Sequence, residues 1–323
     1  MRHAVILACD PGEELRPLTS EETPTAFLAL GDRRTLLQRS IDRLAECVPI
    51  ENLWVIVLPE HRARAEAELQ TAIHVVASSD RGGPVGSLAA ALSEITSSEG
   101  RPVAVLLQPA THVVLDAVAY RKRLLAGLDA ASSKRTGVSF VVGAAQGEER
   151  ATGIQAWPAD MLGDRLAPML RGGPTSIRDA LSAEESGLTV VRMGDVGWID
   201  VADWGAVQRL LEHVEKPWGH ERVWALNRHY AGKILFIRAG ESLSLQYHEI
   251  KDETIRIVSG RMRFRAGASA DALETVVLEP GMSRAVPPRL VHQMEALEDC
   301  TVIEVSTPHL TDVVRLEDRY GRA

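Results

Sequence analysis

Short apolar runs alternate with longer segments of helical period along the first two-thirds of the chain. The runs, at residues 4–7, 53–58, 103–107 and 138–142, are continuously apolar, which is typical of strands buried on both faces. The segments between them predict helices over residues 35–47, 61–70, 87–95 and 118–131. This alternation predicts an α/β domain with a parallel sheet and crossover helices.

The pattern changes after Glu215 to short alternating strands separated by Gly and Pro turns. We expect strands over residues 233–238, 254–258, 261–265, 275–278 and 301–305, and a last helix over residues 207–214. Such a run of strands without intervening helices predicts an all-β barrel. The sequence therefore divides into two domains, residues 1–214 and 215–323, with Glu215-Lys-Pro-Trp-Gly219 opening the second.

Composition and charge narrow the class of protein. A chain of 323 residues is longer than one hydrophobic core usually serves, in agreement with two domains. The net charge of −8 argues against nucleic acid as a partner, because phosphate backbones are bound mainly by clustered Lys and Arg. Three widely spaced cysteines and a first apolar run too short for a signal peptide predict a cytoplasmic protein without disulfides. No stretch approaches the length that crosses a membrane, so no membrane partner is expected.

Four side chains near the C-terminus have the spacing of a metal site. Gln246 and His248 lie two residues apart on a predicted strand, so both side chains face the same side. Glu253 follows after a tight turn at the start of the next strand, and His292 comes from a distant strand. Oxygen and imidazole donors without thiolate suit a divalent transition metal, and the sequence leaves Zn²⁺, Mn²⁺, Fe²⁺, Co²⁺ and Ni²⁺ open.

Glycines and prolines set these residues in a longer pattern. The motif G-x5-Q-x-H-x4-E-x6-G is followed by G-x5-P-x4-H, and its members are Gly240, Gln246, His248, Glu253, Gly260, Gly281, Pro287 and His292. With these motifs the segment resembles a cupin, which implies a jelly-roll barrel. The residues on which this resemblance rests are specific in type and in spacing.

A narrower resemblance covers the predicted second domain. Lys216-Pro-Trp-Gly219, Lys233-Ile, Leu243-Ser-Leu-Gln-Tyr-His248 and the tail Val313-Val-Arg-Leu-Glu-Asp-Arg-Tyr-Gly-Arg322 are similar to the type II phosphomannose isomerase cupins. In that family the counterparts of Gln246, His248, Glu253 and His292 are metal ligands. The family reaction interconverts mannose 6-phosphate and fructose 6-phosphate, so the resemblance implies a metal-dependent isomerase of a sugar phosphate.

Isomerisation requires groups beyond the metal ligands. A base moves a proton between neighbouring carbons, and a Lewis acid, here the metal, holds charge on the substrate oxygens. As the base the sequence offers Lys233, Glu249, Lys251 and Asp252, which spacing does not rank. Lys233 matches a lysine of the family motif and is our first candidate for a cation that holds phosphate or stabilises charge. Arg289 is the second candidate for binding phosphate, and an ordinary surface charge is the alternative for both.

One departure from the isomerase pattern bears on the substrate. The isomerases carry His-Arg-Leu where this chain has His292-Gln-Met294, so we expect a phosphate partner to be missing. Together with the absence of an obvious base, this difference supports the main alternative. That alternative is a non-catalytic metal cupin with a binding or regulatory role toward a sugar phosphate.

The predicted first domain resembles another family. Val5-Ile-Leu-Ala8, Leu15-Arg-Pro-Leu-Thr19, Leu36-Leu-Gln38 and Gly197-Trp-Ile-Asp-Val-Ala-Asp-Trp204 are similar to mannose-1-phosphate guanylyltransferase, which precedes the cupin in bifunctional enzymes. The resemblance implies a Rossmann-like nucleotidyltransferase fold. The domain order of this chain agrees with that of the bifunctional enzymes.

Several catalytic motifs of that family are altered. The loop A-G-G-x-G-T-R, whose amides cradle phosphates, here reads Ala8-Cys-Asp-Pro-Gly-Glu-Glu14, with Glu14 in place of the arginine. Pro-Lys-Gln, Pro-Ala-Asp-His and Ser-Ile-Asp have become Pro24-Thr-Ala26, Pro109-Ala-Thr-His112 and Ser176-Ile-Arg178, and Asp200 alone survives among the metal-binding carboxylates. Phosphoryl transfer depends on positive charge and Mg²⁺, so these losses predict that guanylyltransferase activity is absent.

The sequence thus predicts a degenerate nucleotidyltransferase-like domain fused to a metal-dependent, isomerase-like cupin. Two roles stay open for the first domain. It is either a scaffold that packs on the cupin and supports a homodimer, or a pocket that binds a sugar phosphate or a sugar nucleotide without turnover. An active guanylyltransferase with an altered loop is a further alternative for the chain.

Overall fold

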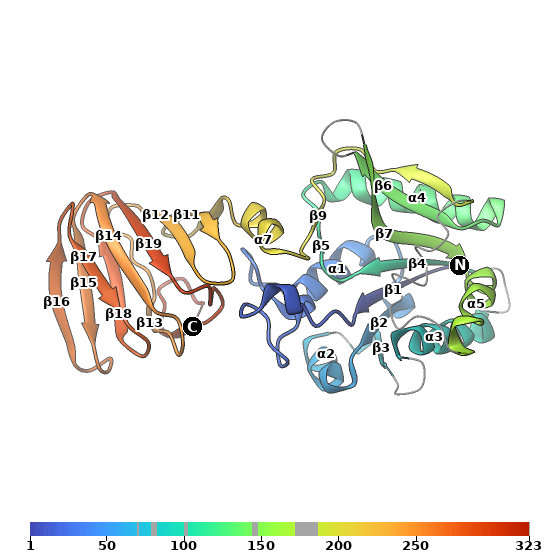
Figure 1. Ribbon diagram of the computed structural model, residues 1–323, viewed down its shortest axis with the longest axis horizontal. Helices are drawn as coiled ribbons and strands as arrows, with labels where there is room; N and C mark the ends of the chain where they lie inside the picture. The colour runs from blue at the N-terminus through green and yellow to red at the C-terminus, as the bar shows by residue number, and fades with distance from the viewer. Residues whose placement is uncertain (70, 79–82, 100–102, 144–147, 172–186, 323) are drawn as a thin grey trace. The chain divides into compact units, whose positions relative to one another are not determined.

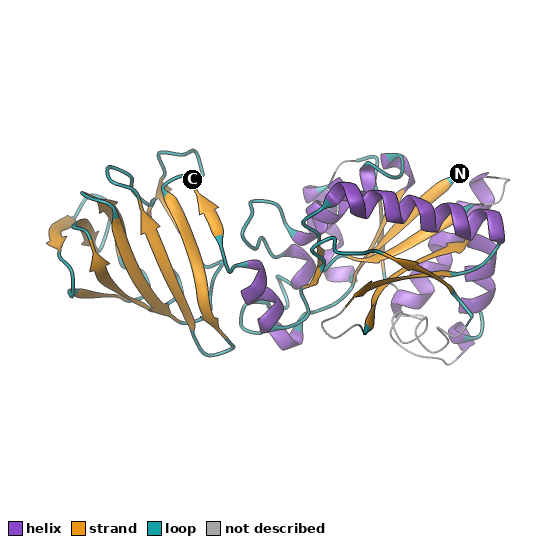
Figure 2. Cartoon of the chain, turned by 90° about the horizontal axis from the view of Figure 1, so that it is seen from above, coloured by secondary structure: helices purple, strands orange, loops and turns teal. Residues whose placement is uncertain are grey.

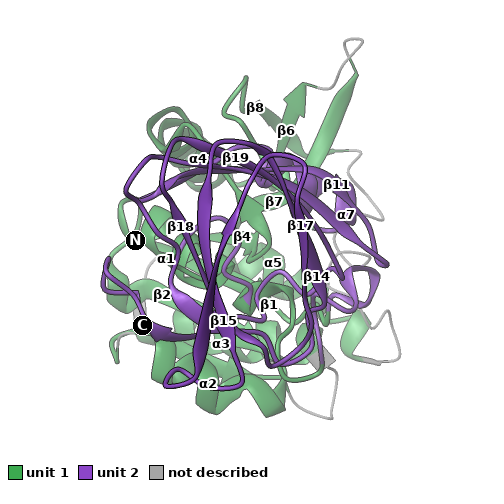
Figure 3. Ribbon diagram, turned by 90° about the vertical axis from the view of Figure 1, so that its left-hand side faces the viewer, with its two compact units in different colours: residues 1–11, 21–27, 34–201 green, residues 12–20, 28–33, 202–323 purple. Residues whose placement is uncertain are grey.

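A computed structural model describes residues 1–69, 71–78, 83–99, 103–143, 148–171 and 187–322, which form two compact units (Figure 3). Unit 1 comprises residues 1–11, 21–27 and 34–201, and unit 2 comprises residues 12–20, 28–33 and 202–323. The domain boundary that the sequence predicts, between residues 214 and 215, stays a prediction. The altered motif Ser176-Ile-Arg178 lies outside the described residues.

Unit 1 is built around a seven-stranded sheet with the order β3-β2-β1-β4-β7-β6-β8 (Figure 1). Its strands are β1 (Arg2–Ala8), β2 (Leu53–Val57), β3 (His74–Ala77), β4 (Ala104–Pro109), β6 (Val138–Gly143), β7 (Glu149–Pro158) and β8 (Thr189–Arg192). The four strands β3, β2, β1 and β4 are parallel, as predicted, whereas β7 runs antiparallel to both β4 and β6. A second, two-stranded sheet joins β5 (His112–Val113) to β9 (Ile199–Asp200).

Helices cover both faces of the large sheet (Figure 2). They are α1 (Leu36–Ala45), α2 (Arg62–Glu68), α3 (Gly83–Glu99), α4 (Ala117–Lys134) and α5 (Ala159–Leu166). Successive residues of a strand face opposite sides, so Ile6 packs in the core with α1 and α4 while Val5 packs in the core with α3 and α5. Both faces of the strands are therefore buried, which explains their continuously apolar runs.

Unit 2 consists of α7 (Trp204–Leu210) and two antiparallel sheets that enclose one apolar core. The sheets have the orders β10-β11-β12-β19-β14-β17 and β16-β15-β18-β13-β20. The strands are β10 (Val214–Lys216), β11 (Gly219–Leu226), β12 (Ala231–Ile237), β13 (Leu245–Tyr247), β14 (Glu253–Ser259), β15 (Met262–Gly267), β16 (Leu273–Leu278), β17 (Ser283–Val286), β18 (Val291–Ala296), β19 (Cys300–Ser306) and β20 (Val314–Glu317). An α/β domain followed by an all-β cupin barrel confirms the predicted fold class.

Alternation along single strands places one set of side chains inside the barrel. On β15 the side chains of Met262 and Phe264 enter the core, whereas Arg263 between them reaches Glu295 on the outer face at 2.7 Å. The turn from β14 to β15 needs Gly260, whose φ is +78°. A Cβ at Gly260 would lie 2.3 Å from the carbonyl oxygen of Asp299, so a larger residue would displace the backbone there.

One predicted element is wrong. The helix expected over residues 207–214 ends at Leu210. Val214 instead begins β10, where it pairs with Glu221 of β11. The apolar residues of this segment fit both patterns, and burial of Val214 in a strand pair decides for the sheet. Among the helices of the described residues, none is long and apolar enough to cross a membrane.

Candidate metal centre

Three of the four predicted metal ligands meet inside the barrel of unit 2. His248 follows β13, Glu253 begins β14, and His292 lies on β18. The Nε2 atom of His248 is 3.7 Å from Oε2 of Glu253, and the Nε2 atom of His292 is 3.5 Å from Oε1. The potential ligand atoms of the three residues all lie within 4.8 Å of one another, and all three residues are buried. This spacing allows the three side chains to hold one metal ion.

The backbone orients both imidazoles toward the same point. The Nδ1 atom of His248 contacts the carbonyl oxygen of Asp312, and the Nδ1 atom of His292 lies 3.0 Å from the carbonyl oxygen of Leu290. These contacts assign the proton to Nδ1 and leave Nε2 as the free lone pair, which is the usual arrangement of a metal-binding histidine. In the part of the chain that is described, neither Nε2 atom has a hydrogen-bond partner although both are buried.

The charge state of the site also suits a metal. Burial lowers the pKa of His248, and the nearby cation of Lys251 lowers it further, so the imidazole is neutral near pH 7. Only the neutral ring binds a metal. Two imidazoles whose Nε2 atoms have no hydrogen-bond partner among the described residues and one carboxylate are a donor set for a divalent transition metal, and the residues present fit such an ion.

Gln246, the fourth predicted ligand, lies on β13 directly opposite His292 on β18. Paired residues on neighbouring strands project to the same face, so the amide lies on the side of the sheet that carries the histidine. The hydroxyl of Ser244 donates a hydrogen bond of 2.6 Å to Oε1 of Gln246. Gln246 stays a predicted ligand.

A buried cluster of charges lies behind Glu253. The ammonium group of Lys251 donates to the carboxylate of Glu253 and, at 2.6 Å, to that of Glu304 on β19. Lys233 on β12 lies 3.8 Å from the same Glu304 carboxylate. Burial disfavours charge on Lys251, but Glu304 and Glu253 outweigh it and raise the pKa of Lys251 above its ordinary value. Lys251 is therefore a cation that supports the ligand Glu253.

Glu304 is the anionic centre of this cluster. Burial alone would raise the pKa of Glu304, yet the cations of Lys233 and Lys251 lower it below its ordinary range. The carboxylate stays ionised inside the barrel as a result. Sequence reasoning missed Glu304, because alternation places it inward on β19 but gives no partner for it.

Asp312 is a second residue that sequence reasoning missed. Its carboxylate accepts hydrogen bonds from the backbone amides of Glu249, Ile250 and Lys251, at 3.1, 2.7 and 2.8 Å. These bonds fix the turn that joins His248 to Glu253. Asp is a common acceptor for turn amides, but a partner more than sixty positions away along the chain leaves no local sequence signal.

The remaining candidates, Glu249 and Arg289, form an exposed ion pair at 3.0 Å beside the ligand turn. The exposed fractions of their side chains are 43% and 79%. The backbone amide of Arg289 donates to the carbonyl oxygen of His248 at 2.7 Å, and Arg289 has a φ of +65°. The structure thus places both residues next to a ligand, with their side chains at the surface.

The departure from the isomerase pattern at Gln293 falls on the other side of its strand. Gln293 lies between the inward residues His292 and Met294 on β18, and its Oε1 atom accepts hydrogen bonds from Arg265 on the outer face. Its Nε2 atom donates to the carbonyl oxygen of Leu243 at 3.1 Å. The side chain at position 293 therefore lies on the strand face opposite His292, and the loss of a phosphate partner at this position stays a prediction.

The surviving carboxylate of unit 1 has a different environment. Asp200 on β9 pairs across the small sheet with His112 on β5, and the Thr111 hydroxyl donates to Oδ1 of Asp200 at 2.7 Å. Thr111 is the position at which the resembled family carries a second carboxylate. Here a hydroxyl occupies it and engages the remaining acid.

The altered loop after β1 is divided between the two units, because Asp10 belongs to unit 1 whereas Glu13 and Glu14 belong to unit 2. Asp10, Glu13 and Glu14 in the loop after β1 are all exposed. Thr25 and Ala26, which replace the lysine motif, are buried. Exposed carboxylates in this loop would oppose the approach of a triphosphate.

Two regions of the chain match families of known proteins. Residues 3–154 match the family model Nucleotidyl transferase, and residues 206–318 match Mannose-6-phosphate isomerase C-terminal. Mannose-1-phosphate guanylyltransferase RfbM of Salmonella typhimurium is 25% identical over 115 residues, which are 34% of this chain but only 23% of that relative. The mannose-1-phosphate geranyltransferase of Thermus thermophilus is similar in fold, with a TM-score of 0.52 and 22% identity. That match covers 67% of this chain and 80% of the Thermus chain.

Proposed function

Because the chain joins a nucleotidyl transferase region to a mannose-6-phosphate isomerase C-terminal region, we propose that unit 2 is a metal-dependent isomerase of sugar phosphates. One observation carries the proposal. The buried Nε2 atoms of His248 and His292 face the Glu253 carboxylate, and no described residue satisfies them by a hydrogen bond. The substrate class follows from the family of the second region, with mannose 6-phosphate and fructose 6-phosphate as the first pair to test.

Each residue of the centre has a proposed task. His248, His292 and Glu253, together with Gln246, would hold the divalent metal. When bound, the metal supplies a Lewis acid that stabilises negative charge on the sugar oxygens. Lys251 orients Glu253 by direct contact with its carboxylate. The contacts of Glu253 with Lys251, and of both imidazoles with backbone carbonyls, would hold the metal-binding side chains in place before the substrate binds.

The candidate base is Glu249. Two carboxylates hold Lys251 in its protonated form, which suits a cation better than a proton acceptor. Lys233 is similarly drawn to Glu304, so it is proposed to stabilise charge or to bind phosphate. Glu249 directly follows the ligand His248 and keeps an accessible carboxylate, and Arg289 across the ion pair is a proposed substrate contact.

Replacing Glu249 tests its assignment as the base. We expect Glu249→Gln to lower kcat for hexose-phosphate isomerisation by about 10²- to 10⁴-fold while metal content is unchanged, which is the usual contribution of a general base. Glu274→Gln, at an exposed position of β16, is the matched control. An unchanged kcat in Glu249→Gln assigns the proton transfer to another group.

Unit 1 is proposed to retain the nucleotidyltransferase fold without its chemistry. The observations are the contact of Thr111 with Asp200 and the exposed acids Asp10, Glu13 and Glu14 in the loop after β1, of which Asp10 lies in unit 1. Incubation with GTP and mannose 1-phosphate should yield no GDP-mannose and no pyrophosphate. Product formation at a rate that depends on Asp200 would restore the guanylyltransferase alternative. A homodimer and a cytoplasmic location stay predictions.

The whole proposal is tested by metal analysis of the purified chain coupled to an isomerase assay across several hexose phosphates. We expect bound transition metal and turnover of at least one hexose phosphate, both lost in His248→Ala. Turnover that persists in a metal-free preparation would contradict the mechanism. Bound metal with sugar-phosphate binding but no turnover would instead identify the non-catalytic cupin, which the paired state of Lys251 favours.

A further inference from the structure

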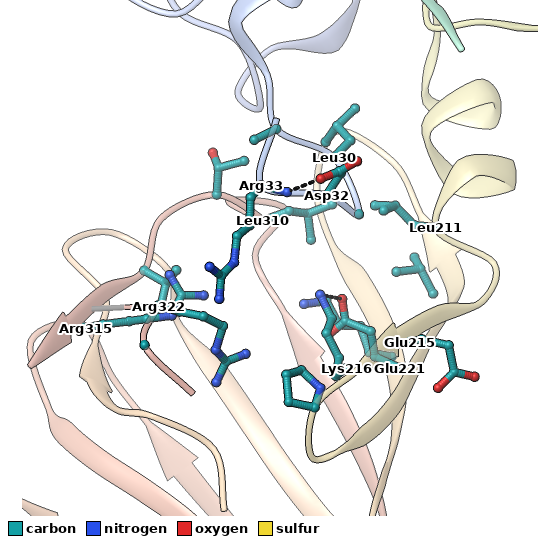
Figure 4. A pocket seen from close by; sticks show the side chains of 18 residues that line it. Leu30, Asp32, Arg33, Leu211, Glu215, Lys216, Glu221, Leu310, Arg315 and Arg322 are labelled. Atoms are coloured by element: carbon teal, nitrogen blue, oxygen red, sulfur yellow. Dashed lines mark hydrogen bonds and ion pairs between the residues drawn. The ribbon is translucent and has the colours of Figure 1, made fainter. Parts of the chain in front are cut away.

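Unit 2 contains a cavity of about 710 Å³ that none of the three buried metal ligands lines (Figure 4). Its walls come from β10, β11, β12, β20 and the segment Leu28–Arg33, which belongs to the same compact unit. A cavity of this size accommodates a small metabolite. Polar and charged side chains make up much of its lining, so the fitting ligand is a polar one.

Three arginines extend into this space. Figure 4 shows Arg33, Arg315 and Arg322 in the same part of the cavity, while Lys216 and Glu221 lie apart from them as a pair. Arg33 comes from the N-terminal part of the chain, whereas Arg315 lies on β20 and Arg322 in the tail that follows. The fold therefore gathers guanidinium groups from positions nearly three hundred residues apart.

The acids of the cavity have other partners among the described residues. Glu221 is engaged by Lys216 at 3.1 Å, Glu215 by His213 at 2.9 Å, and Asp32 accepts from the backbone amide of Arg33. Of the arginines, Arg322 is paired with Asp318 at 2.5 Å. The positive charge of the other two, Arg33 and Arg315, has no ion-pair partner that the described coordinates show.

Arg315 offers the cavity an unpartnered hydrogen-bond donor. Its Nε atom is buried and, among the described residues, has no hydrogen-bond partner. Burial lowers the pKa of Arg315, and the like charges of Arg322 and Arg33 lower it further, whereas Asp318 and Glu221 act in the opposite direction. A half-buried guanidinium with an unpartnered, buried Nε atom next to other cations is favoured by an anion that accepts from it.

The cavity is connected to the metal centre through charged side chains. Lys233 lines the cavity and lies 3.8 Å from Glu304. Glu304 in turn binds Lys251, which contacts the ligand Glu253. A ligand bound by the arginines would therefore lie in the cavity that Lys233 lines, and Lys233 contacts the charged cluster next to the metal centre.

We infer that this cavity binds the phosphate group of a sugar phosphate, with Arg315 and Arg33 as the main anion-binding groups. The identity of the ligand as a sugar phosphate rests on the proposed function. Binding of its phosphate group does not, since guanidinium groups bind phosphate without a metal. Guanidinium pairs with phosphate through charge-assisted, frequently bidentate hydrogen bonds, which the free Nε atom of Arg315 can complete. This pocket would supply a phosphate partner in place of the arginine that the resembled isomerases carry at position 293.

Calorimetric titration of the full chain with mannose 6-phosphate tests the pocket, with mannose and inorganic phosphate as separate probes. We expect mannose 6-phosphate to bind, phosphate to compete with it, and mannose to bind far more weakly. Arg315→Gln and Arg33→Gln should each weaken binding of mannose 6-phosphate by about tenfold or more, the loss of a charge-assisted contact. Arg315→Lys, which keeps the charge, should lose less.

The controls separate this inference from the proposed isomerase. Arg284→Gln, at an exposed position of β17 outside the cavity, should bind mannose 6-phosphate like the unchanged chain. His248→Ala should lose metal and any isomerase activity yet still bind inorganic phosphate, so the pocket stands even where the isomerase fails. Unchanged binding in both Arg315→Gln and Arg33→Gln, or an equal loss in Arg284→Gln, would overturn the inference.

Discussion

The acidic residues Glu253 of unit 2 and Asp200 of unit 1 have different kinds of partners. In unit 2 the carboxylate of Glu253 faces two imidazole Nε2 atoms and is held from behind by Lys251. In unit 1 the carboxylate of Asp200 meets the hydroxyl of Thr111, where a second carboxylate would be needed to bind Mg²⁺. One region brings together three residues that could hold a metal ion, and in the other the acid Asp200 contacts a hydroxyl.

This difference teaches that a fold and its chemistry are maintained by different residues. The sheet of unit 1 is buried on both faces by apolar side chains, so its architecture survives changes in the loops at its edge. The barrel of unit 2 instead contains ionised groups that must be paired to be tolerated. Loss of one member there affects both the metal centre and the stability of the barrel.

The largest expected effect comes from removing Lys251. Lys251→Met leaves Glu253 and Glu304 buried without their shared cation, which typically costs about 3–5 kcal/mol in the free energy of unfolding. The unfolding transition of unit 2 in urea measures this loss. Lys251→Arg retains the charge and should recover much of it. A loss below about 1 kcal/mol in Lys251→Met would mean that water screens the pair, as at a surface.

A smaller effect is expected at the turn between the ligands. Asp312→Ala releases three backbone amides and loosens the segment between His248 and Glu253. Residues that orient metal ligands contribute about 10- to 100-fold to metal affinity, and we expect a loss in that range. Competition with a chelator measures it, with Asp299→Ala on a distant turn as the control. Equal metal affinities in Asp312→Ala and Asp299→Ala would show that Asp312 does not support the metal ligands.

The comparison can also be sharpened in unit 1. Thr111→Asp restores a second carboxylate next to Asp200, so we expect added Mn²⁺ to raise the melting temperature of the variant but not that of the unchanged unit. Thr111→Asn, which is similar in shape without the charge, is the control. If Mn²⁺ stabilises the unchanged unit equally, then unit 1 has kept a metal site and the contrast between the units fails.

The smallest effect is expected at Gln293. Gln293→Arg introduces the residue of the isomerase pattern on the outer strand face beside Arg265. Surface substitutions away from special contacts change stability by about 0.5 kcal/mol or less, and metal content and turnover should be unchanged as well. A clear gain in isomerase activity would show that the outer face takes part in the reaction.

Most of the fold could be predicted because its signals are local. The strands β12, β14 and β19 follow alternation, and the β1 and β2 strands follow continuous apolar runs that only a sheet covered on both faces explains. The segment at residues 207–214 fits both a helix and a strand, and the pairing that separates the two is a tertiary contact.

The site was predictable only in part. His248, Glu253 and His292 could be found because strand period and glycine turns fix their spacing. Asp312, Glu304 and the cavity arginines could not, since their partners lie far away along the chain and nothing nearby in the sequence requires them. The orientation of Gln293 was not predicted either, because it depends on which strand face meets the core.

The central claim is that the intact chemistry of this chain lies in the metal centre of unit 2. Its most direct test is the transition-metal content of the purified chain by mass spectrometry, compared with His248→Ala and with His229→Ala at an exposed hairpin position. We predict stoichiometric metal in the unchanged chain and in His229→Ala, and none in His248→Ala. Metal retained by His248→Ala, or a chain that fails to bind any divalent transition metal supplied to it, would contradict the account.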